Sequence, residues 1–343
     1  MQRKLTRALK IRYLLNRPLI PLLFREKTSW LGISYDSDSL QDGAGAQLQR
    51  IYSIYALTRL LKLQYIHSPL KRIRYPGLAS LENNTEDPGL VNRYNEVFSI
   101  PSDLEPPVEI RTCHCRKPNA LTLWKPKKEA ERSRKFTLVR CVNPYPVQEN
   151  HPDSYAHARK ITPFKKPPGR PSPLRIALHV RRGELYAVDS PRMLPNAYHI
   201  KIANGIRAAL ESLSLNYVIE LYGELPTKPF HVTPQTVGFA GRIDRPVLMN
   251  PGMNRLEEFE TLPHLQKFIN LDAIESLQRM ATADILVMSR SSFSFLAAIL
   301  NPRAVVFYSK FWHAAPRDWL RTRRTGDFPS ELFLEKLAEN GLA

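Results

Sequence analysis

The sequence predicts an α/β protein made of two units, each with a parallel sheet. Residues 31–35, 47–63 and 64–67 read in turn as an apolar run, a helical stretch with one apolar face, and a second apolar run, which together are typical of a βαβ unit. After residue 173 the alternation of strand and helix returns and continues to residue 308. Strands separated by helices pair in parallel through right-handed crossovers.

The second series contains most of the expected elements. Its strands are expected at residues 175–180, 217–222, 284–288 and 304–308, and its helices at 197–213, 271–281 and 292–300. Residues 330–342 form a last amphipathic helix in this prediction. Because parallel sheets bind ligands outside the carboxyl ends of their strands, the residues that follow each strand are the first candidates for a functional site.

Length and proline content divide the chain. Its 343 residues fit two domains of roughly 150 residues each. Prolines crowd residues 101–173, so loops are expected there, with a strand at 136–142 and solvated loop charge at 125–134. Since residues 161–173 are the clearest linker, the predicted division is an N-terminal domain over 1–160 with a proline-rich insertion, the linker, a C-terminal domain over 174–322, and a terminal helix over 323–343.

The chain is strongly basic. Its 50 Lys and Arg against 32 Asp and Glu give a formal net charge of +18, which attracts nucleic acid, anionic membranes or phosphorylated small molecules alike. No recognisable nucleic-acid module accompanies the charge, so nucleic acid is not the expected partner. Three cysteines, at 113, 115 and 141, make no even disulfide framework and too few zinc ligands, so a reducing compartment and no metal are expected.

Residues 1–24 mix basic and apolar side chains. No uninterrupted run approaches the ~20 residues of a membrane span, and the apolar patch at 19–24 is shorter than the about 7–15 residues of a signal-peptide core. The pattern is typical of a basic arm that could lie on an anionic membrane, or of a plain surface helix. The expectation is a cytoplasmic protein, in the first case peripheral to the inner face of a membrane.

Charged side chains gather at the end of the strand 175–180. His179, Arg181, Arg182 and Glu184 stand there, and guanidiniums offer fixed planar donors to phosphate oxygens. Neighbours on a strand point to opposite faces, so one arginine can face the cleft while the other braces the loop or pairs with a carboxylate. A surface arginine pair in a very basic protein explains the dipeptide equally well.

A serine-rich segment opens the helix 292–300. Ser291 and Ser292 can cap the free N–H groups of this helix, and the same N–H groups with the positive end of the helix dipole bind anions. Together with the arginines, this helix start forms a predicted pyrophosphate cradle that needs no metal.

These motifs resemble those of the α-1,2- and α-1,6-fucosyltransferases. Residues 176–184 look like the H-x-R-R-G-D segment of that family, with Glu184 in place of the usual Asp. Residues 272–300 look like its closing motif, and residues 43–47 are similar to its G-x-G-N-Q turn, with Ala46 where the family carries Asn. The likeness is specific over about fifty residues in all.

The resemblance implies a GT-B architecture, in which two Rossmann-like domains face a cleft. It further implies an inverting, metal-independent glycosyltransferase that moves fucose from GDP-fucose to a glycan acceptor, with no cofactor besides the donor substrate. The donor would lie in the C-terminal nucleotide-sugar-binding domain, and the acceptor would face the N-terminal domain.

The resemblance also implies roles for single residues. Arg182 would bind phosphate and stabilise the leaving charge, Arg181 would brace it, and Asp272 would hold the arginine loop. The further donor contacts are expected from His179, Ser291, Ser292 and, at the guanine edge, Glu224. The acceptor-side turn is Gly43, Gly45 and Gln47, and the unranked candidates for the catalytic base are Glu184, Asp42 and His179.

Two other functions remain open at this point. One is a GT-B transferase that uses another nucleotide sugar, because the motifs specify pyrophosphate better than they specify the sugar. The other is a non-catalytic GT-B-like protein that binds nucleic acid or another polyanion through its basic surface, and Ala46 in place of Asn supports it.

Overall fold

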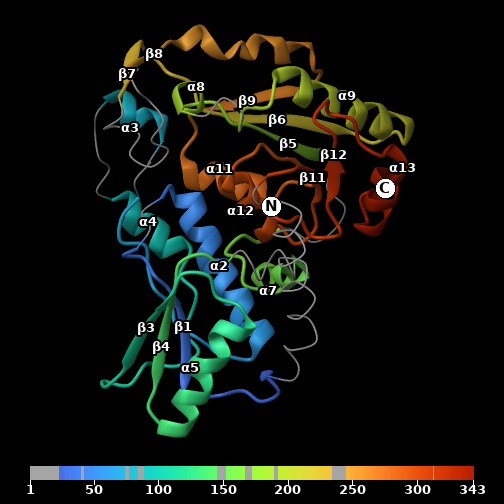
Figure 1. The fold of residues 1–343 in the computed structure, drawn as a ribbon. Helices are drawn as coiled ribbons and strands as arrows, with labels where there is room; N and C mark the ends of the chain where they lie inside the picture. The colour runs from blue at the N-terminus through green and yellow to red at the C-terminus, as the bar shows by residue number, and fades with distance from the viewer. Residues whose placement is uncertain are drawn as a thin grey trace, which may run out of the picture.

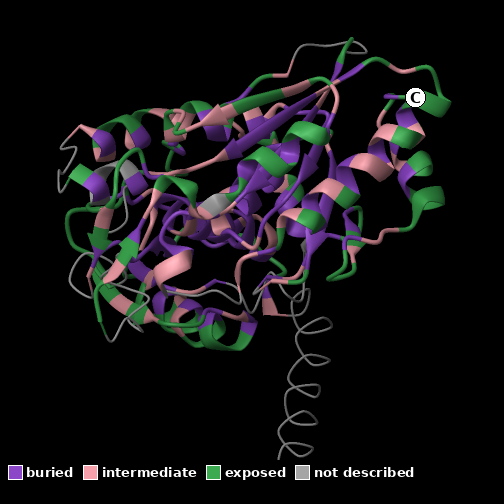
Figure 2. Cartoon of the chain, turned by 90° about the horizontal axis from the view of Figure 1, so that it is seen from above, coloured by how far each residue is buried: buried purple, intermediate pink, exposed green. Residues whose placement is uncertain are grey.

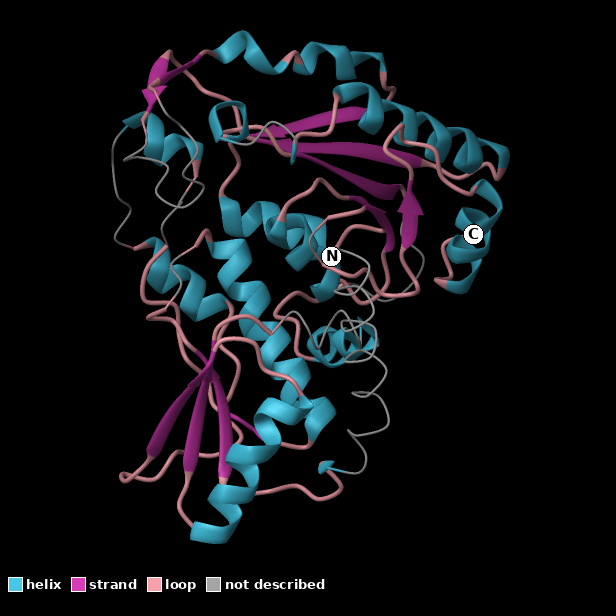
Figure 3. Ribbon diagram, viewed as in Figure 1, coloured by secondary structure: helices cyan, strands magenta, loops and turns pink. Residues whose placement is uncertain are grey.

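The computed structural model describes residues 23–39, 42–73, 77–83, 89–144, 152–166, 172–188, 192–233, 245–311 and 313–343. Two parallel sheets lie at opposite ends of the molecule, with helices between them (Figure 3). The α/β class with parallel sheets is therefore confirmed. The basic residues 1–22, predicted to form an amphipathic arm, lie outside the described residues.

The N-terminal sheet has four parallel strands in the order β2-β1-β4-β3. These are β1 (Leu31–Tyr35), β2 (Gln64–Tyr65), β3 (Arg111–Cys115) and β4 (Thr137–Cys141). The helix after β1 is α2 (Ala44–Leu61), which begins at Ala44 rather than at Gln47 as predicted. The turn of residues 43–47 is thus already the first turn of a helix.

The middle of the chain, residues 78–160, is more helical than predicted. It contains α3 (Leu78–Asn83), α4 (Leu90–Val97), α5 (Ala120–Ser133) and α7 (Tyr155–Lys160). The prediction of a solvated loop at 125–134 is wrong, because Asn119 and Thr122 cap α5 reciprocally and its residues at helical spacing are buried. Among them is Lys127, whose ammonium pairs with Glu131 at 2.6 Å.

The C-terminal sheet has six parallel strands in the order β12-β11-β10-β5-β6-β9. They are β5 (Leu174–Val180), β6 (Tyr217–Gly223), β9 (Leu265–Ile269), β10 (Ile285–Val287), β11 (Val305–Ser309) and β12 (Leu320–Thr322). Counted along the chain from the β9 edge, this is the 3-2-1-4-5-6 order of the Rossmann fold. The order reverses between β5 and β10, so the ligand crevice is expected at the carboxyl ends of these two strands.

Helices cover both faces of this sheet (Figure 1). On one face lie α9 (Asn196–Ser212) and α13 (Ser330–Glu339), and on the other lie α11 (Ala273–Ala281) and α12 (Ser292–Leu300). Seen from above, the strands are buried between these layers (Figure 2). The short helices α8 (Leu185–Val188), η1 (Pro152–Ser154), η3 (Pro251–Asn254) and η4 (Leu256–Thr261) and the antiparallel pair β7 (Phe230–Val232) and β8 (Val247–Met249) complete the described elements.

The two units share one hydrophobic core. Buried side chains of α2, α4 and α7 pack against those of α11 and α12 in a single cluster. Phe295 of α12 lies at the centre of this contact, with its ring against those of Tyr155, Tyr308 and Trp319. The units are therefore joined through helices, and the starts of α2 and α12 lie close together at this contact.

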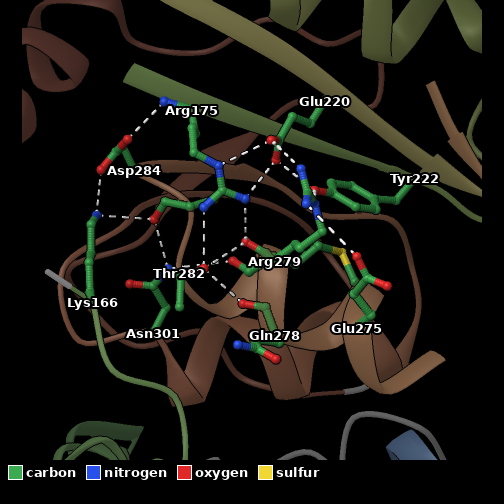
Figure 4. Close-up of polar contacts among 12 residues, drawn as sticks. Lys166, Arg175, Glu220, Tyr222, Glu275, Gln278, Arg279, Thr282, Asp284 and Asn301 are labelled. Carbon is green, nitrogen blue, oxygen red and sulfur yellow. Dashed lines mark hydrogen bonds and ion pairs between the residues drawn. The ribbon is translucent and has the colours of Figure 1, made fainter. Parts of the chain in front are cut away.

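A buried polar network ties the predicted linker to the C-terminal unit (Figure 4). Lys166 pairs with Asp284 at 2.5 Å, with the two side chains 7% and 1% exposed. Arg175 of β5 and Arg279 of α11 both donate to Glu220 of β6, at 2.8–3.1 Å. Since breaking a buried ion pair is costly, this contact anchors Lys166 to the second unit although Lys166 precedes β5.

Candidate functional site

A cavity of about 490 Å³ lies between the two units. Its lining from the C-terminal unit includes residues that follow β5 and β10, the strand ends that the topology indicates, and residues that follow β6 and β9. The N-terminal unit contributes residues 42–46, Arg50, Gly77 and Tyr94. The volume is in the range of a site for a small molecule or nucleotide.

Arg181 is braced by carboxylates. Its guanidinium donates to both oxygens of Glu184, at 2.5 and 2.6 Å, and to Oε2 of Glu224 at 2.7 Å. Glu184 is 1% exposed and so has almost no contact with solvent. The bracing position expected for one arginine of the pair is therefore occupied by Arg181, and Glu184 is the carboxylate that holds the loop.

Arg182 is buried beside the cavity without such a partner. It is 4% exposed, and its guanidinium donates to Oδ1 of Asn196 and to the carbonyl oxygen of Arg181. No carboxylate of a described residue lies within 4.0 Å of the Arg182 guanidinium, so Arg182 forms no ion pair with these residues. Burial lowers the pKa of Arg182. A buried cation with only neutral acceptors attracts an anion from the cavity.

Ser289 connects the ends of β5 and β10. Its hydroxyl donates to the carbonyl oxygen of His179 at 2.5 Å and accepts from the backbone N–H of Arg181 at 2.9 Å. Ser291 then caps α12 by accepting from the N–H of Phe293 at 3.3 Å. The arginine loop and the start of α12 are thus held in one hydrogen-bonded unit.

The N-termini of α2 and α12 meet at the cavity. Both first turns line it, and the first turn of α2 has neither an acidic residue nor a side-chain cap. A Cβ atom on Gly45 would lie 2.7 Å from Cα of Phe293, so only glycine allows this approach. Two helix starts with free N–H groups present two positive dipole ends to one cavity.

The side chain of Gln47 stabilises the turn of residues 43–47 through hydrogen bonds. It is fully buried, and its Nε2 donates to the carbonyl oxygens of Asp42 at 2.7 Å and Arg72 at 2.8 Å. It is not among the residues of the cavity wall, whereas Ala46 is. Gln47 therefore shapes the turn without lining the cavity, and its assignment to the acceptor side stays a prediction.

The three candidate catalytic bases, Glu184, His179 and Asp42, differ in how readily each can accept a proton. Glu184 is held by Arg181, and His179 is 5% exposed. Burial, with the charges of Arg181 and Arg182, lowers the pKa of His179 to about 3, which makes it a weak base. Asp42 lines the cavity from the N-terminal unit, with its side chain 23% exposed and paired with Arg50 at 2.7 Å.

Asp272 does not hold the arginine loop, which corrects the sequence-based prediction. Its carboxylate caps α11 by accepting from the N–H groups of Ile274 and Glu275 at 3.0 and 3.2 Å. It also pairs with Arg93 of α4 at 2.6 Å. Because Asp272 is the N-cap residue of α11, its oxygens are engaged by the helix and by the opposite unit.

Glu224 bridges the two units. Besides its bond to Arg181, its Oε1 accepts from the backbone N–H of Leu78 at 3.1 Å. The side chain is 31% exposed and lines the cavity. Its assignment to the guanine edge stays a prediction.

Other residues of the site carried no recognisable signal in the sequence. Arg50, Tyr94, Arg192 and His313 line the cavity, and Ser289 and Asn196 support the arginines behind it. Only Ser289 has a position that could have indicated its role, since it follows the predicted strand 284–288 directly.

The described part of the chain contains neither a candidate metal centre nor a candidate membrane span. Its His, Cys, Asp and Glu side chains make no group of three or more that could hold a metal ion. None of its helices combines the length and the apolar character needed to cross a membrane.

No protein-family model and no curated protein matches the sequence. Among solved structures, the ADP-heptose lipopolysaccharide heptosyltransferase II of E. coli is similar over 90% of this chain and 98% of its own, with 14% identity and a TM-score of 0.36. E. coli heptosyltransferase WaaC with ADP-2-deoxy-2-fluoro heptose is similar over 90% and 99%, with 9% identity and a TM-score of 0.37.

POFUT1 in complex with GDP is similar over 85% of this chain and 98% of its own, with 12% identity and a TM-score of 0.36. The architecture itself, with two parallel-sheet units facing a cleft, is of the predicted GT-B type.

Proposed function

We propose that the chain is an inverting glycosyltransferase that uses a nucleoside diphosphate sugar as donor, and that the donor is GDP-fucose, as the resemblance of its motifs implies. The observation that carries the proposal is Arg182. This buried guanidinium lines a cavity at the switch point of a Rossmann-ordered sheet, and the described groups that accept its hydrogen bonds are neutral, a carbonyl and an amide oxygen. An anion of the size of a pyrophosphate fits both the charge and the place.

Arg182 would stabilise the negative charge of the leaving diphosphate. When the bond between the anomeric carbon and the diphosphate breaks, negative charge grows on the β-phosphate. Donors that are already in place lower the barrier, because they need no reorganisation during the reaction. Arg182 and the starts of α2 and α12 supply such donors, with Ser291 and Ser292 at the start of α12.

Arg181 would act by holding this arrangement. Its bonds to Glu184 and Glu224 keep its guanidinium fixed, and its backbone N–H is held by Ser289. The two arginines thus have different tasks, although they are adjacent in the sequence. The proposed independence from metal ions rests on the positive charge that these groups provide.

Asp42 is the proposed catalytic base. An inverting transfer needs a proton acceptor on the side opposite the leaving group. Asp42 lines the cavity from the N-terminal unit, whereas Arg182 lines it from the C-terminal unit, and Asp42 is more exposed than Glu184. Its ion pair with Arg50 holds the carboxylate in place. The acceptor is proposed to be a glycan hydroxyl that enters from this side.

Calorimetry tests the donor site. GDP, GDP-fucose, UDP and ADP are titrated into the wild-type protein, R182A and R321A, with EDTA present. Arg321 is an exposed arginine of the edge strand β12 and is the matched control. We expect guanine nucleotides to bind the wild type and R321A alike, and R182A to lose about 30-fold or more in affinity, as for removal of a buried charge partner.

The outcomes separate the alternatives. Tighter binding of ADP or UDP than of GDP would keep the transferase and replace the donor. Absence of binding to any of the four nucleotides would contradict the proposed function. Retention on polyanions that is sensitive to salt and equal in wild type and R182A would then favour the non-catalytic alternative.

A further inference from the structure

Two cysteines far apart in the sequence lie side by side in the N-terminal sheet. Cys115 ends β3 and Cys141 ends β4, and the two residues are direct partners in the register of these parallel strands. Both are free thiols. Neighbouring strands lie about 4.8 Å apart, which is within the range of about 4.4–6.8 Å between the Cα atoms of a disulfide. The pair therefore meets the distance requirement of a disulfide bond.

The third cysteine, Cys113, is less suited to either partner. It lies two residues before Cys115 on β3 and pairs with Val139 in the register. At about 3.3 Å per residue, its Cα lies about 6.6 Å from that of Cys115, near the upper limit for a disulfide. Cys141 lies one strand across and two residues along, which is farther still. The geometry thus selects one pair and leaves Cys113 as a matched control.

The surroundings of Cys115 stabilise a thiolate. Its sulfur lies 3.7 Å from Oγ1 of Thr122, in the first turn of α5. The hydrogen bond with Cys141, together with those of Thr122 and the backbone N–H of Lys117, outweighs burial and lowers the pKa of Cys115 to about 6. Cys115 is half-buried, so solvent reaches it. A thiolate that solvent can reach is the form of cysteine that reacts with oxidants.

Cys141 has the opposite surroundings. It is fully buried in the core of the N-terminal unit. The hydrogen bond to Cys115, together with burial, raises the pKa of Cys141, which therefore stays a neutral thiol. An accessible thiolate next to a second thiol is the usual arrangement of a cysteine that is oxidised first and a cysteine that resolves the product.

We propose that Cys115 and Cys141 are a modification site at which hydrogen peroxide forms a disulfide bond between β3 and β4. The thiolate of Cys115 attacks one peroxide oxygen, the O–O bond breaks, and hydroxide leaves from a sulfenic acid. The sulfur of Cys141 then attacks this sulfenic acid. The S–S bond forms, the S–O bond breaks, and the leaving hydroxide takes the proton of Cys141 to become water. This inference is independent of the proposed function, because it needs no nucleotide.

The proposed disulfide lies at the base of the loop after β1. The carbonyl oxygen of Cys141 accepts from the N–H of Asp36 at 2.8 Å. His114, the neighbour of Cys115, bonds through Nδ1 to the carboxylate of Asp36 at 2.9 Å. Oxidation would therefore change the strand ends that support this loop.

Peptide mapping by mass spectrometry tests the pair. The full-length wild type, C113A, C115A and C141A are treated with hydrogen peroxide in the folded state, and the remaining thiols are alkylated. We expect the wild type and C113A to lose two hydrogen atoms in mass and to contain one peptide pair linked through Cys115 and Cys141. Dithiothreitol should restore the thiols. C141A should carry a sulfenic acid on Cys115, which dimedone traps, and C115A should keep its thiols.

The pH dependence of the reaction tests the order of the steps. An ordinary cysteine has a pKa of about 8.5, so its oxidation rate rises about tenfold or more between pH 7 and pH 8.5. We expect the rate in the wild type to change by less than about twofold over this range, because Cys115 is already a thiolate. A tenfold rise would overturn the role of Cys115 as the attacking residue.

The other outcomes of the mapping are equally clear. A disulfide through Cys113, a disulfide between two molecules, or a wild type that keeps all its thiols would each overturn the proposed site. Conversion of Cys115 to sulfinic acid without a disulfide would show that Cys141 does not resolve the sulfenic acid, and would also overturn it. If C115A or C141A does not fold, the linked peptides of the wild type and C113A decide the question.

Discussion

The first strands of the two sheets, β5 and β1, are directly followed by side chains of opposite charge. At the end of β5, the guanidinium of Arg182 is buried with neutral acceptors only. After β1, the side chains are carboxylates, and each has a basic partner: Asp36 accepts from Nδ1 of His114 at 2.9 Å, and Asp42 pairs with Arg50 at 2.7 Å. The comparison teaches that parallel-sheet topology selects the place of a site, while the residues after each strand select its chemistry.

The two ends also differ in how firmly they are held. Ser289, Glu184 and Glu224 fix the loop after β5 through buried hydrogen bonds. The loop after β1 has its ion pairs nearer the surface, with Asp38 bonded to Lys71 and Arg140. The firmly held loop after β5 suits the binding of the proposed donor. The more exposed loop after β1 suits the entry of the proposed acceptor.

The largest expected effect is on the acidic side. D42N keeps the size of the side chain and a hydrogen bond to Arg50, but it removes the proton acceptor. We expect donor affinity to stay within about twofold and the rate of GDP release from GDP-fucose, with water in place of the acceptor, to fall at least about 100-fold. D38N, in the same loop with a side chain 46% exposed, is the control. Equal rates in D42N and wild type would rule out Asp42 as the base.

A second prediction concerns the pH dependence of the free energy of unfolding, to which the buried histidines His179 and His313 contribute. Burial lowers the pKa of both His179 and His313 to about 3, whereas a histidine in the unfolded chain titrates near about 6.5. Between these values the unfolded state binds more protons, so the free energy of unfolding falls as the pH drops below 6.5. The loss is about 1.4 kcal/mol for each of the two residues at one pH unit below 6.5.

Urea denaturation at pH 7.5 and 5.5 measures this effect. H179N should reduce the pH-dependent loss by about 1.4 kcal/mol, and H231N, at an exposed position of β7, should leave it unchanged. An equal loss in H179N and wild type would show that His179 is protonated without cost in the folded protein.

A substitution at Gly45 can break the close approach between the starts of α2 and α12. A methyl group there would meet the backbone of Phe293 at 2.7 Å and separate the starts of α2 and α12. We expect G45A to lower the free energy of unfolding by about 1–3 kcal/mol, as for overpacking, and to weaken nucleotide binding. G252A is the matched control, since no atom lies within 4 Å of its added Cβ. A G45A protein as stable as G252A would contradict the close approach.

The smallest expected effect is at Ser289. S289A leaves the N–H of Arg181 and the carbonyl oxygen of His179 without their shared partner. We expect a loss of about 1–2 kcal/mol in the free energy of unfolding and a weaker affinity for GDP. S212A removes the hydroxyl of a serine on α9 that bonds only within its helix, and it should change neither quantity. Unchanged GDP affinity in S289A would show that the arginine loop holds its geometry without this bond.

Much of the fold follows from local patterns. The predicted strand 31–35 and helix 292–300 agree with β1 and α12, because a continuous apolar run indicates an element that is buried on all sides. The short edge strands β9 and β12 and the capped helix α5 were not predicted. Edge strands have weak patterns, and the prolines around α5 indicated loop, although Pro126 is accommodated inside the helix.

The candidate site likewise combines features that the sequence predicted with contacts that only the structure revealed. The sequence by itself placed Arg181 and Arg182 at a strand end and Ser291 at a helix start, because strand and helix boundaries are local properties. Only the tertiary structure decided that Arg181 is the braced arginine, that Asp272 pairs with Arg93, and that Glu224 reaches Leu78. These pairs join segments far apart in the chain, so they depend on how the two sheets pack, which periodicity along the sequence does not record.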